Sequence, residues 1–254
     1  MSSGGAQPDR PGAPAAPRVA VVVGGTRRVG RWVSETLSSD GCSVHALYRN
    51  DDAAASELKQ WAQAGGGELH TARVDATAYS ALREVISAIA SQHGRIDVLV
   101  NSAGPAGQGP IAGTEPAEFD SLWRGNVLVV HHAVLAALPF MQQGGRIISF
   151  VSAGADTLRA YRDVPLYAAC KTALVSYSRS LARELAPRGI TVNCIALGIT
   201  TLASEGAPTV SESHLPARRC VEQADVAAAL LYLASPAASQ LTGTVLNLNG
   251  GWAL

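Results

Sequence analysis

The chain of 254 residues has no excess of charge, because its 20 basic and 20 acidic residues give a formal net charge of +0. No block of lysine and arginine interrupts this balance. Nucleic acids and anionic membranes attract strongly basic surfaces, so the composition gives no electrostatic reason to expect either as a partner. We therefore expect the partner to be a small molecule.

Cysteine is also sparse, and the four cysteines form no C-x-x-C pair. This pattern favours reduced thiols in a cytoplasmic protein over a secreted disulfide scaffold. No 18 apolar residues run together, which predicts no spanning helix, and no apolar stretch follows Met1 as a secretory signal requires. His131 and His132 have no cysteine or carboxylate at metal-ligand spacing, so we expect no metal site.

The length and a hydrophobic content of 47% predict one large domain with a substantial core. Residues 1–17 differ from the rest, because they are mostly Ser, Gly, Ala and Pro, with prolines at positions 8, 11, 14 and 17. That composition is typical of a solvated, polyproline-like segment. We predict a disordered arm over 1–17 and a single folded domain over 18–254.

Within the predicted domain, short apolar runs alternate with longer amphipathic stretches. The clearest runs cover 19–23, 44–47, 98–100, 146–151, 191–196 and 244–248. Short apolar runs suit parallel strands that are buried on both faces. The alternation predicts an α/β fold, a Rossmann-type doubly wound parallel sheet of about seven strands, whose ligands bind at the carboxyl ends of the strands.

A glycine-rich turn follows the first predicted strand. Residues 24–30 read GGTRRVG and lead into an amphipathic stretch over 31–39. Glycine lets a backbone approach a pyrophosphate, and a helix N-terminus adds unpaired N–H groups and partial positive charge. A plain strand-to-helix turn would give the same pattern, so the turn alone is a weak signal. As a dinucleotide site it would consist of Gly24, Thr26, Arg27, Arg28, Val29 and Gly30.

Tyr167 and Lys171 stand four residues apart in a stretch with a helical pattern that begins near Pro165. A helix stacks residues at that spacing, so the phenol and the ammonium would face the same way. A free phenol has a pKa near ~10, and a neighbouring cation favours its ionised form. The pair is therefore a candidate general acid/base.

Together these residues resemble the short-chain dehydrogenase/reductase family, whose pattern is a TGxxxGxG turn, an NNAG segment, a helix asparagine, a serine and YxxxK. In the same order this chain has residues 23–30, Asn101-Ser102-Ala103-Gly104, Asn126, Ser152, and Tyr167 with Lys171. VNCIALG at 192–198 and NLNGGW at 247–252 are similar to two later family segments. The resemblance covers about 18–252 and implies a dinucleotide-binding catalytic domain over 18–254.

The resemblance implies hydride transfer between a nicotinamide cofactor and a carbonyl or alcohol carbon. Tyr167 would pass the proton, and Lys171 would lower the tyrosine's pKa and hold the ribose. Ser152 would hydrogen-bond the substrate oxygen, and Asn126 would anchor the water and backbone chain that resupplies protons. The family's serine usually precedes the tyrosine by 13 positions, which is Gly154 here, so we interpret Ser152 as displaced by a two-residue loop insertion.

The end of the second predicted strand indicates which cofactor is used. An acidic residue there would accept the ribose hydroxyls of NAD, but Tyr48 takes the position and Arg49 follows it. Arg27 and Arg49 would clamp the 2′-phosphate of NADP, so NADPH is favoured over NADH, unless Asp51 or Asp52 turns inward. The remaining cofactor contacts that the resemblance implies are Asp75 at the adenine, Ala76, Asn101, Ser102, Ala103, Gly104, Gly198 and Thr200.

Arg28 departs from the family pattern, because it replaces the second glycine of TGxxxGxG, as in the pteridine reductase branch. In that branch the arginine reaches cofactor and substrate. Ser152 and Ala106 argue against a pterin, since they stand where that branch has an aspartate and the phenylalanine that stacks on the pterin. We expect Arg28 to donate to a substrate oxygen or to the pyrophosphate, and a capping role in the turn is the alternative. Leu197 and Asn249 also depart from the family, where a proline and an aspartate stand.

Specificity is expected in the loops over 105–113, 154–165 and 200–219, which are rich in Gly, Pro, Ser and Thr. The candidate substrate contacts are Arg28, Pro105, Ser152 and Tyr161.

The leading hypothesis is an NADPH-dependent reductase of a ketone on a small metabolite. One alternative is an imine or pteridine C=N reductase, which Arg28 supports. Another is a catalytically inactive dinucleotide-binding sensor or assembly protein, suggested by Arg28, Leu197 and the displaced serine. The resemblance also implies a homodimer or homotetramer.

Overall fold

The computed structural model describes residues 16–107, 109–157, 159–161, 163–202 and 211–252. Fifteen residues of the predicted arm, 1–15, lie outside the described residues, so the arm stays a prediction. Parts of the three predicted specificity loops also lie outside them, at 108, 158, 162 and 203–210.

Seven parallel strands form one sheet in the order β3-β2-β1-β4-β5-β6-β7. The strands are β1 Val19–Val23, β2 Ser43–Tyr48, β3 Leu69–Arg73, β4 Ile96–Asn101, β5 Met141–Ser152, β6 Thr191–Leu197 and β7 Val245–Leu248. The strand order reverses between β1 and β4, where a doubly wound sheet opens a crevice for a ligand. The predicted α/β class is confirmed.

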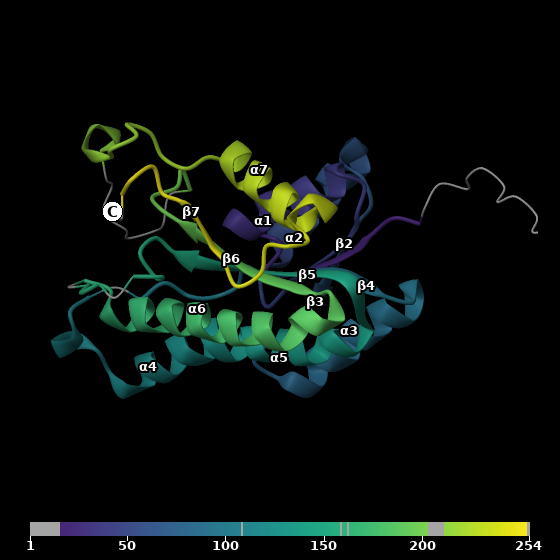
Figure 1. The fold of residues 1–254 in the computed structure, drawn as a ribbon, viewed down its shortest axis with the longest axis horizontal. Helices are drawn as coiled ribbons and strands as arrows, with labels where there is room; N and C mark the ends of the chain where they lie inside the picture. The colour runs from purple at the N-terminus through teal and green to yellow at the C-terminus, as the bar shows by residue number, and fades with distance from the viewer. Residues whose placement is uncertain (1–15, 108, 158, 162, 203–210, 253–254) are drawn as a thin grey trace, which may run out of the picture.

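Helices cover both faces of the sheet (Figure 1). The helices are α1 Arg28–Ser39, α2 Asp52–Trp61, α3 Tyr79–His93, α4 Pro116–Trp123, α5 Val129–Ala137, α6 Pro165–Leu185 and α7 Gln223–Ala234. α1, α2 and α7 contribute to the core on one face, whereas α3, α5 and α6 contribute to the core on the other. A single π-helical turn, Arg124–Leu128, joins α4 to α5.

The central strand β1 shows why the chain folds this way. All five of its residues are buried, with Val21 and Val23 in the core under α3, α5 and α6 and Val22 in the core under α1, α2 and α7. Side chains alternate between the faces of a strand, so a continuous apolar run requires a helix layer on each side. No helix in the part of the chain that the structure describes is long and apolar enough to cross a membrane.

Candidate functional site

The turn after β1 is so tight that it admits only glycine at two positions. A Cβ on Gly24, whose φ is +78°, would lie 2.8 Å from the backbone N of Ala103, and one on Gly30 would lie 1.9 Å from the carbonyl oxygen of Gly24. Ser34 stabilises the turn by donating from Oγ to the Gly25 carbonyl at 2.8 Å. The turn therefore brings bare backbone against the end of β4, which is the surface that a pyrophosphate needs.

The N-terminus of α1 opens at this turn. Its N-cap residue, Arg27, makes no side-chain capping hydrogen bond, so no side chain satisfies the first N–H groups of the helix in the usual way. Such N–H groups, with the positive end of the helix dipole, favour an anion. The predicted residues Thr26, Val29 and Gly30 all lie at this end of α1, and Thr26 is buried. The site therefore fits the phosphates of a dinucleotide.

Arg28 adopts a left-handed backbone conformation with φ of +52°. Among the described residues only Arg218 shares this feature with it outside glycine. For an L-residue this conformation costs roughly 1–2 kcal/mol, which a glycine at the same position would avoid. The guanidinium lies near the phenol of Tyr167 and acts to lower its pKa. The structure thus brings Arg28, which departs from the family pattern, close enough to Tyr167 for its charge to act on the phenol.

At the end of β2, the two aspartates belong to the start of α2. Asp51 is the N-cap, accepting from the backbone N of Ala54 at 2.9 Å, and it also forms a 3.0 Å ion pair with Arg27. Asp52 accepts from the Tyr48 hydroxyl at 2.8 Å. Arg49 is exposed. The sequence analysis missed the pairing of Arg27 with Asp51, because it depends on how the β1 turn meets the start of α2.

Asp75 follows β3 and is exposed, and it accepts two hydrogen bonds from Thr77, one from N at 2.9 Å and one from Oγ1 at 2.8 Å. The charges of Arg49 and Arg124 both act on its carboxylate. Arg124 was not predicted as part of the site, since it comes from the distant π turn. The carbonyl of Ala76 contacts His132 Nδ1 at 3.1 Å. His132 thus has a structural contact.

The segment after β4 is held by two buried asparagines. Asn101 donates from Nδ2 to Ser149 Oγ at 3.2 Å, while Asn126 donates from Nδ2 to the carbonyls of Pro105 and Leu122, each at 3.0 Å. The Oδ1 atoms of both asparagines are buried and have no hydrogen-bond partner among the described residues. Asn126 lies in the π turn between α4 and α5, and such turns are frequent at functional sites.

Gly104 is the point where the β4 segment and Asn126 meet. Its φ is +141°, and a Cβ there would lie 2.2 Å from Asn126 Oδ1. Ser102 ties the same segment to β1 by donating from N to the Val23 carbonyl at 3.0 Å. The segment at 101–104 therefore contacts both the end of β1 and Asn126, which places these three matches to the family next to one another.

Tyr167 and Lys171 lie together in the first turns of α6, with Nζ of the lysine 5.4 Å from the centroid of the phenol ring. Lys171 is buried and donates to the Phe150 carbonyl at 3.2 Å, which fixes it against β5. Burial lowers its pKa to about 8. α6 begins at Pro165, a favourable residue for the first turn because it has no N–H to leave unpaired.

The expected lowering of the tyrosine's pKa by Lys171 is wrong. Burial raises the pKa of Tyr167 to about 12, and the cation that acts against this rise is Arg28. Lys171 lies over the ring and is hydrogen-bonded to a carbonyl of β5, whereas loss of hydration penalises the phenolate directly. The phenol therefore keeps its proton at neutral pH.

Ser152 is the last residue of β5, half-buried and in register with Leu197 of β6. Gly154, at the family's usual spacing from Tyr167, has a φ of +78° and offers no hydroxyl. The hydroxyl of the predicted substrate residue Tyr161 donates a hydrogen bond to the Ala153 carbonyl at 3.0 Å. This hydroxyl therefore holds the loop after β5 in place. The N of Gly109 donates to the Asp163 carbonyl at 2.7 Å and joins two predicted specificity loops.

Beyond β6, Gly198 lies close to the C-terminal segment. A Cβ there would lie 2.8 Å from Asn249 Cα, and its N donates to the Leu248 carbonyl at 2.9 Å. Thr200 forms an isolated parallel bridge with Val221. Asn249, which replaces the family's aspartate, accepts from the N of Gly251 at 2.9 Å. These contacts hold the chain at the carboxyl ends of β6 and β7.

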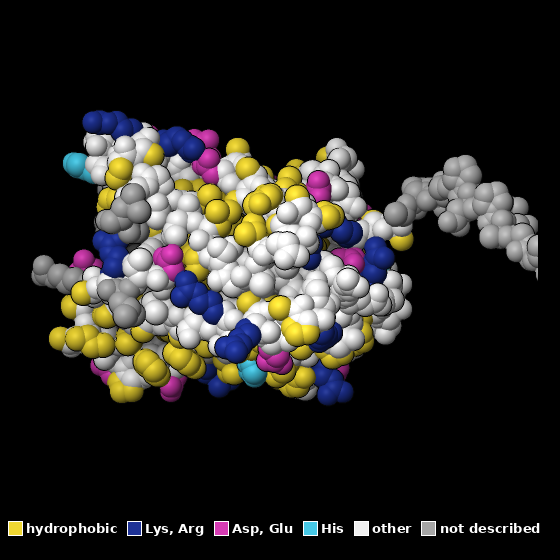
Figure 2. Space-filling view, in the orientation of Figure 1, with side chains coloured by type: hydrophobic (Ala, Val, Ile, Leu, Met, Phe, Trp, Pro, Cys, Tyr) yellow, Lys and Arg dark blue, Asp and Glu magenta, His cyan; other side chains and the backbone are white. Residues whose placement is uncertain are grey.

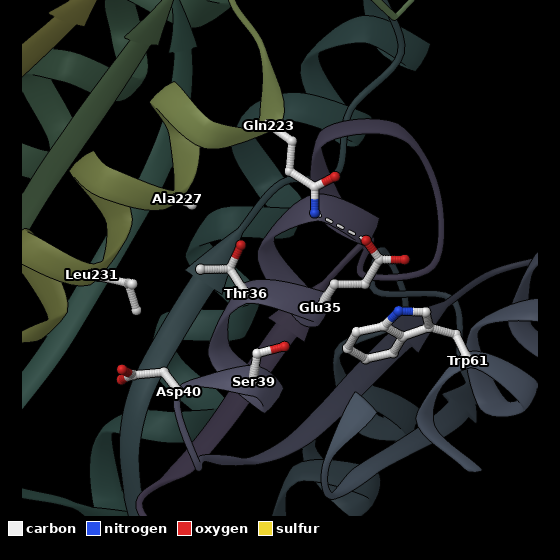
Figure 3. A pocket seen from close by; sticks show the side chains of 8 residues that line it. All are labelled: Glu35, Thr36, Ser39, Asp40, Trp61, Gln223, Ala227 and Leu231. Atoms are coloured by element: carbon white, nitrogen blue, oxygen red, sulfur yellow. Dashed lines mark hydrogen bonds between the residues drawn. The ribbon is translucent and has the colours of Figure 1, made fainter. Parts of the chain in front are cut away.

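A cavity of about 520 Å³ lies away from this site, between α1, α7 and Trp61 (Figure 3). Its acidic side chains already have partners. Glu35 accepts from Arg31 at 2.8 Å and from Gln223 at 3.0 Å, and Asp40 pairs with Arg18 at 3.2 Å. The contact between Gln223 and Glu35 therefore joins α7 to α1 across this cavity.

Comparison with known proteins connects this geometry to characterised relatives. The profile of a family described as enoyl-(acyl carrier protein) reductase matches residues 24–253. The chain is 32% identical to the 3-oxoacyl-[acyl-carrier-protein] reductase FabG of Haemophilus influenzae, over 92% of this chain and 97% of that protein.

Solved structures agree with the sequence relatives. A blue fluorescent protein from a metagenomic library, in complex with NADPH, is 31% identical with a TM-score of 0.85, covering 93% of this chain and 98% of that one. A short chain dehydrogenase of Burkholderia cenocepacia, in complex with NADP, is 30% identical with a TM-score of 0.84, covering 92% and 97%.

Proposed function

Because this chain belongs to the short-chain dehydrogenase/reductase family, we propose that it reduces the carbonyl group of a small metabolite with NADPH. The observation that carries the proposal is the meeting of Tyr167, Lys171 and Arg28 beside a glycine-lined turn. The relatives described as 3-oxoacyl reductases support a ketone as the substrate group.

NADPH would be held by the turn after β1, which includes Arg27, and by Arg49 just after β2. The backbone cradle at Gly24 and Gly30 and the uncapped start of α1 suit the pyrophosphate. Arg27 and Arg49 suit the 2′-phosphate, with Arg27 exchanging Asp51 for the ligand. Relatives in complex with NADPH and NADP support this choice. When bound, this cofactor supplies the hydride.

Tyr167 would deliver the proton to the carbonyl oxygen. Its raised pKa, about 12, means that the phenol carries a proton at neutral pH and can donate it as negative charge develops on the oxygen. The cation of Arg28 then stabilises the phenolate that remains. Ser152 Oγ, at the end of β5, would donate a second hydrogen bond to the same oxygen.

A second candidate function is reduction of a C=N bond, and it rests on Arg28. A guanidinium beside the proton donor would hydrogen-bond a polar heterocycle or an imine-bearing substrate. The same Tyr167 proton would then go to nitrogen in place of oxygen.

The test is to incubate the protein with NADPH and a panel of 3-oxoacyl thioesters, simple ketones, imines and dihydropteridines while following NADPH absorbance. Tyr167→Phe removes the proton donor, so we expect kcat to fall by about 10²–10⁴-fold. The dissociation constant for NADPH should stay within about threefold, because the ring remains.

Each outcome separates the alternatives. Turnover of ketones that is lost in Tyr167→Phe supports the proposal, and turnover of imines or dihydropteridines alone supports the C=N reductase. NADPH binding without consumption of any substrate indicates the inactive sensor. Equal activity in Tyr167→Phe contradicts the proposed proton donor. The homodimer or homotetramer stays a prediction, which sedimentation equilibrium tests.

A further inference from the structure

Asp52, the first residue of α2, lies just beyond the end of β2, and both oxygens of its carboxylate accept a hydrogen bond. Oδ1 accepts from the Tyr48 hydroxyl at 2.8 Å, and Oδ2 accepts from Arg73 Nη1 at 3.2 Å. The hydrogen bond to Asp52 raises the pKa of the Tyr48 hydroxyl, so this hydroxyl keeps its proton and remains a donor. The carboxylate of Asp52 is therefore held by side chains of β2 and β3.

Arg73 is the last residue of β3, the strand beside β2. Besides pairing with Asp52, its guanidinium donates from Nε to the carbonyl of Arg49 at 3.1 Å. The next residue, Val74, donates from N to the Tyr48 carbonyl at 2.7 Å. Arg73 thus joins the start of α2 to Arg49, the residue just after β2 that we propose to bind the 2′-phosphate.

Two other carboxylates near this edge of the sheet have partners within their own turns. Asp51 caps α2 by accepting from the backbone N of Ala54 at 2.9 Å, and Asp75 accepts from both N and Oγ1 of Thr77. Such hydrogen bonds close local turns and do not require a distant residue. Asp52 differs from them, because its charge is balanced by an arginine of another strand.

A carboxylate without a cationic partner at this edge would change the choice of cofactor in two ways. It would accept hydrogen bonds from the ribose hydroxyls of NADH, as an acidic residue near the end of β2 does in dinucleotide-binding folds. It would also repel the 2′-phosphate of NADPH. The ion pair with Arg73 counteracts both effects at Asp52.

We propose that Arg73 is a positioning residue for cofactor selectivity: it keeps the carboxylate of Asp52 paired, so that the site favours NADPH over NADH. This inference rests on the proposed use of NADPH. Arg73 acts through Asp52 and not by binding the cofactor. Because the two side chains are 60% and 63% exposed, the effect is modest in size.

Exposed ion pairs occur elsewhere on the surface, and basic and acidic side chains lie next to one another at several places in Figure 2. Arg95 has the same kinds of contact as Arg73, since it pairs with Asp97 at 2.9 Å and donates to the carbonyl of Ala16 at 3.1 Å. Arg95 directly precedes β4, so in this parallel sheet it stands at the opposite edge from Arg73. It is therefore the matched control.

The test is fluorescence titration of the full-length protein with NADPH and with NADH at low ionic strength. In Arg73→Gln we expect the dissociation constant for NADPH to rise about three- to fivefold, while that for NADH stays the same or falls. Arg73→Lys keeps the cation and should lose less selectivity than Arg73→Gln. Arg95→Gln should change neither constant.

Asp52→Asn separates a positioning role from direct binding. When Asp52→Asn is already present, Arg73→Gln frees no carboxylate, so the dissociation constant for NADPH should not change further. A loss of NADPH affinity in this background equal to that in the parent protein overturns the proposal, because it shows that Arg73 acts on the cofactor directly. Unchanged selectivity in Arg73→Gln also overturns it.

Binding is measured without a carbonyl substrate, so the result does not depend on turnover. If the parent protein binds NADPH and Arg73→Gln keeps its selectivity, this inference fails and the proposed function stands. A parent protein that binds neither cofactor overturns both. Unfolding midpoints check that the variants are folded, which we expect because Arg73, Asp52 and Arg95 are at least partly exposed.

Discussion

The turn after β1 and the start of α6 form the two halves of the site, and they are built from different parts of the chain. The turn acts through backbone, since Gly24 and Gly30 matter because they have no side chain. The start of α6 acts through side chains, since Tyr167 and Lys171 matter for their protons and charges. A backbone site is set by local sterics, whereas the pKa of a buried group is set by everything packed around it.

The turn can be broken by a single methyl group. Gly30→Ala would place Cβ 1.9 Å from the Gly24 carbonyl oxygen, so the turn must open. We expect NADPH binding to weaken by at least about 100-fold, or about 2.7 kcal/mol at 1.36 kcal/mol per tenfold. Fluorescence titration with NADPH measures this change. Gly113→Ala is the matched control, because nothing lies within 4 Å of a Cβ there, and an equal loss in both variants would contradict the argument.

Arg27 in the turn after β1 and Arg49 just after β2 add side-chain charge to the backbone half of the site. In Arg27→Gln/Arg49→Gln we expect the NADPH dissociation constant to rise about 10–100-fold while that for NADH changes little, because only NADPH has a 2′-phosphate. The affinity that Arg27 adds for the 2′-phosphate is partly offset, because Arg27 must first break its ion pair with Asp51. Parallel titrations with both cofactors measure the effect. An equal loss of affinity for NADPH and NADH would show that the two arginines do not bind the 2′-phosphate.

Burial should shift ionisation elsewhere in the molecule as it does on α6. His45 of β2 contacts His93 of α3 through their Nε2 atoms at 2.9 Å and stacks on His70 of β3, which contacts Glu68. Burial, with the charges of His70 and His93, lowers the pKa of His45 from 6.5 to about 4. Between pH 6.5 and 4, His45 is therefore protonated in the unfolded chain but not in the folded chain. The free energy of unfolding falls as the pH drops through this range.

Converted at about 1.36 kcal/mol per pH unit, this loss is at most about 3 kcal/mol, and about 2 kcal/mol after allowance for solvent screening. Urea unfolding at pH 7 and pH 4 measures it. His45→Gln should be less sensitive to acid than the parent protein over this range. Equal acid sensitivity in the two proteins would mean that other groups titrate.

The smallest effect concerns Arg28, where the two halves of the site meet. Arg28→Gly relieves the positive φ, which costs roughly 1–2 kcal/mol, but it also loses the contacts that the side chain makes, so we expect stability to rise by up to about 1 kcal/mol. It also removes the cation that lowers the pKa of Tyr167, so the alkaline limit of activity should move to higher pH. Arg218→Gly relieves a similar φ of +55° without changing that limit. An equal shift of the alkaline limit in both variants would show that the charge of Arg28 does not act on Tyr167.

The sequence predicted the fold better than it predicted the ionisation of the candidate site residues. Apolar runs located strands such as β1, although β5 begins at Met141 and not at residue 146, because Gln142, Gln143 and Gly144 break the pattern. Tyr167 and Lys171 were located by spacing alone, since a helix must stack them. The pairing of Arg27 with Asp51 and the approach of Arg124 to Asp75 join segments that no local pattern connects.

By itself, the sequence determined the parallel sheet, the glycine turn and the order of the family residues, because each follows from sterics and periodicity within a short segment. Only the tertiary structure decided that Tyr167 holds its proton more tightly than a free phenol and that Arg28 opposes this. Hydration and charge at a residue depend on neighbours from the whole chain, and only folding assembles those neighbours.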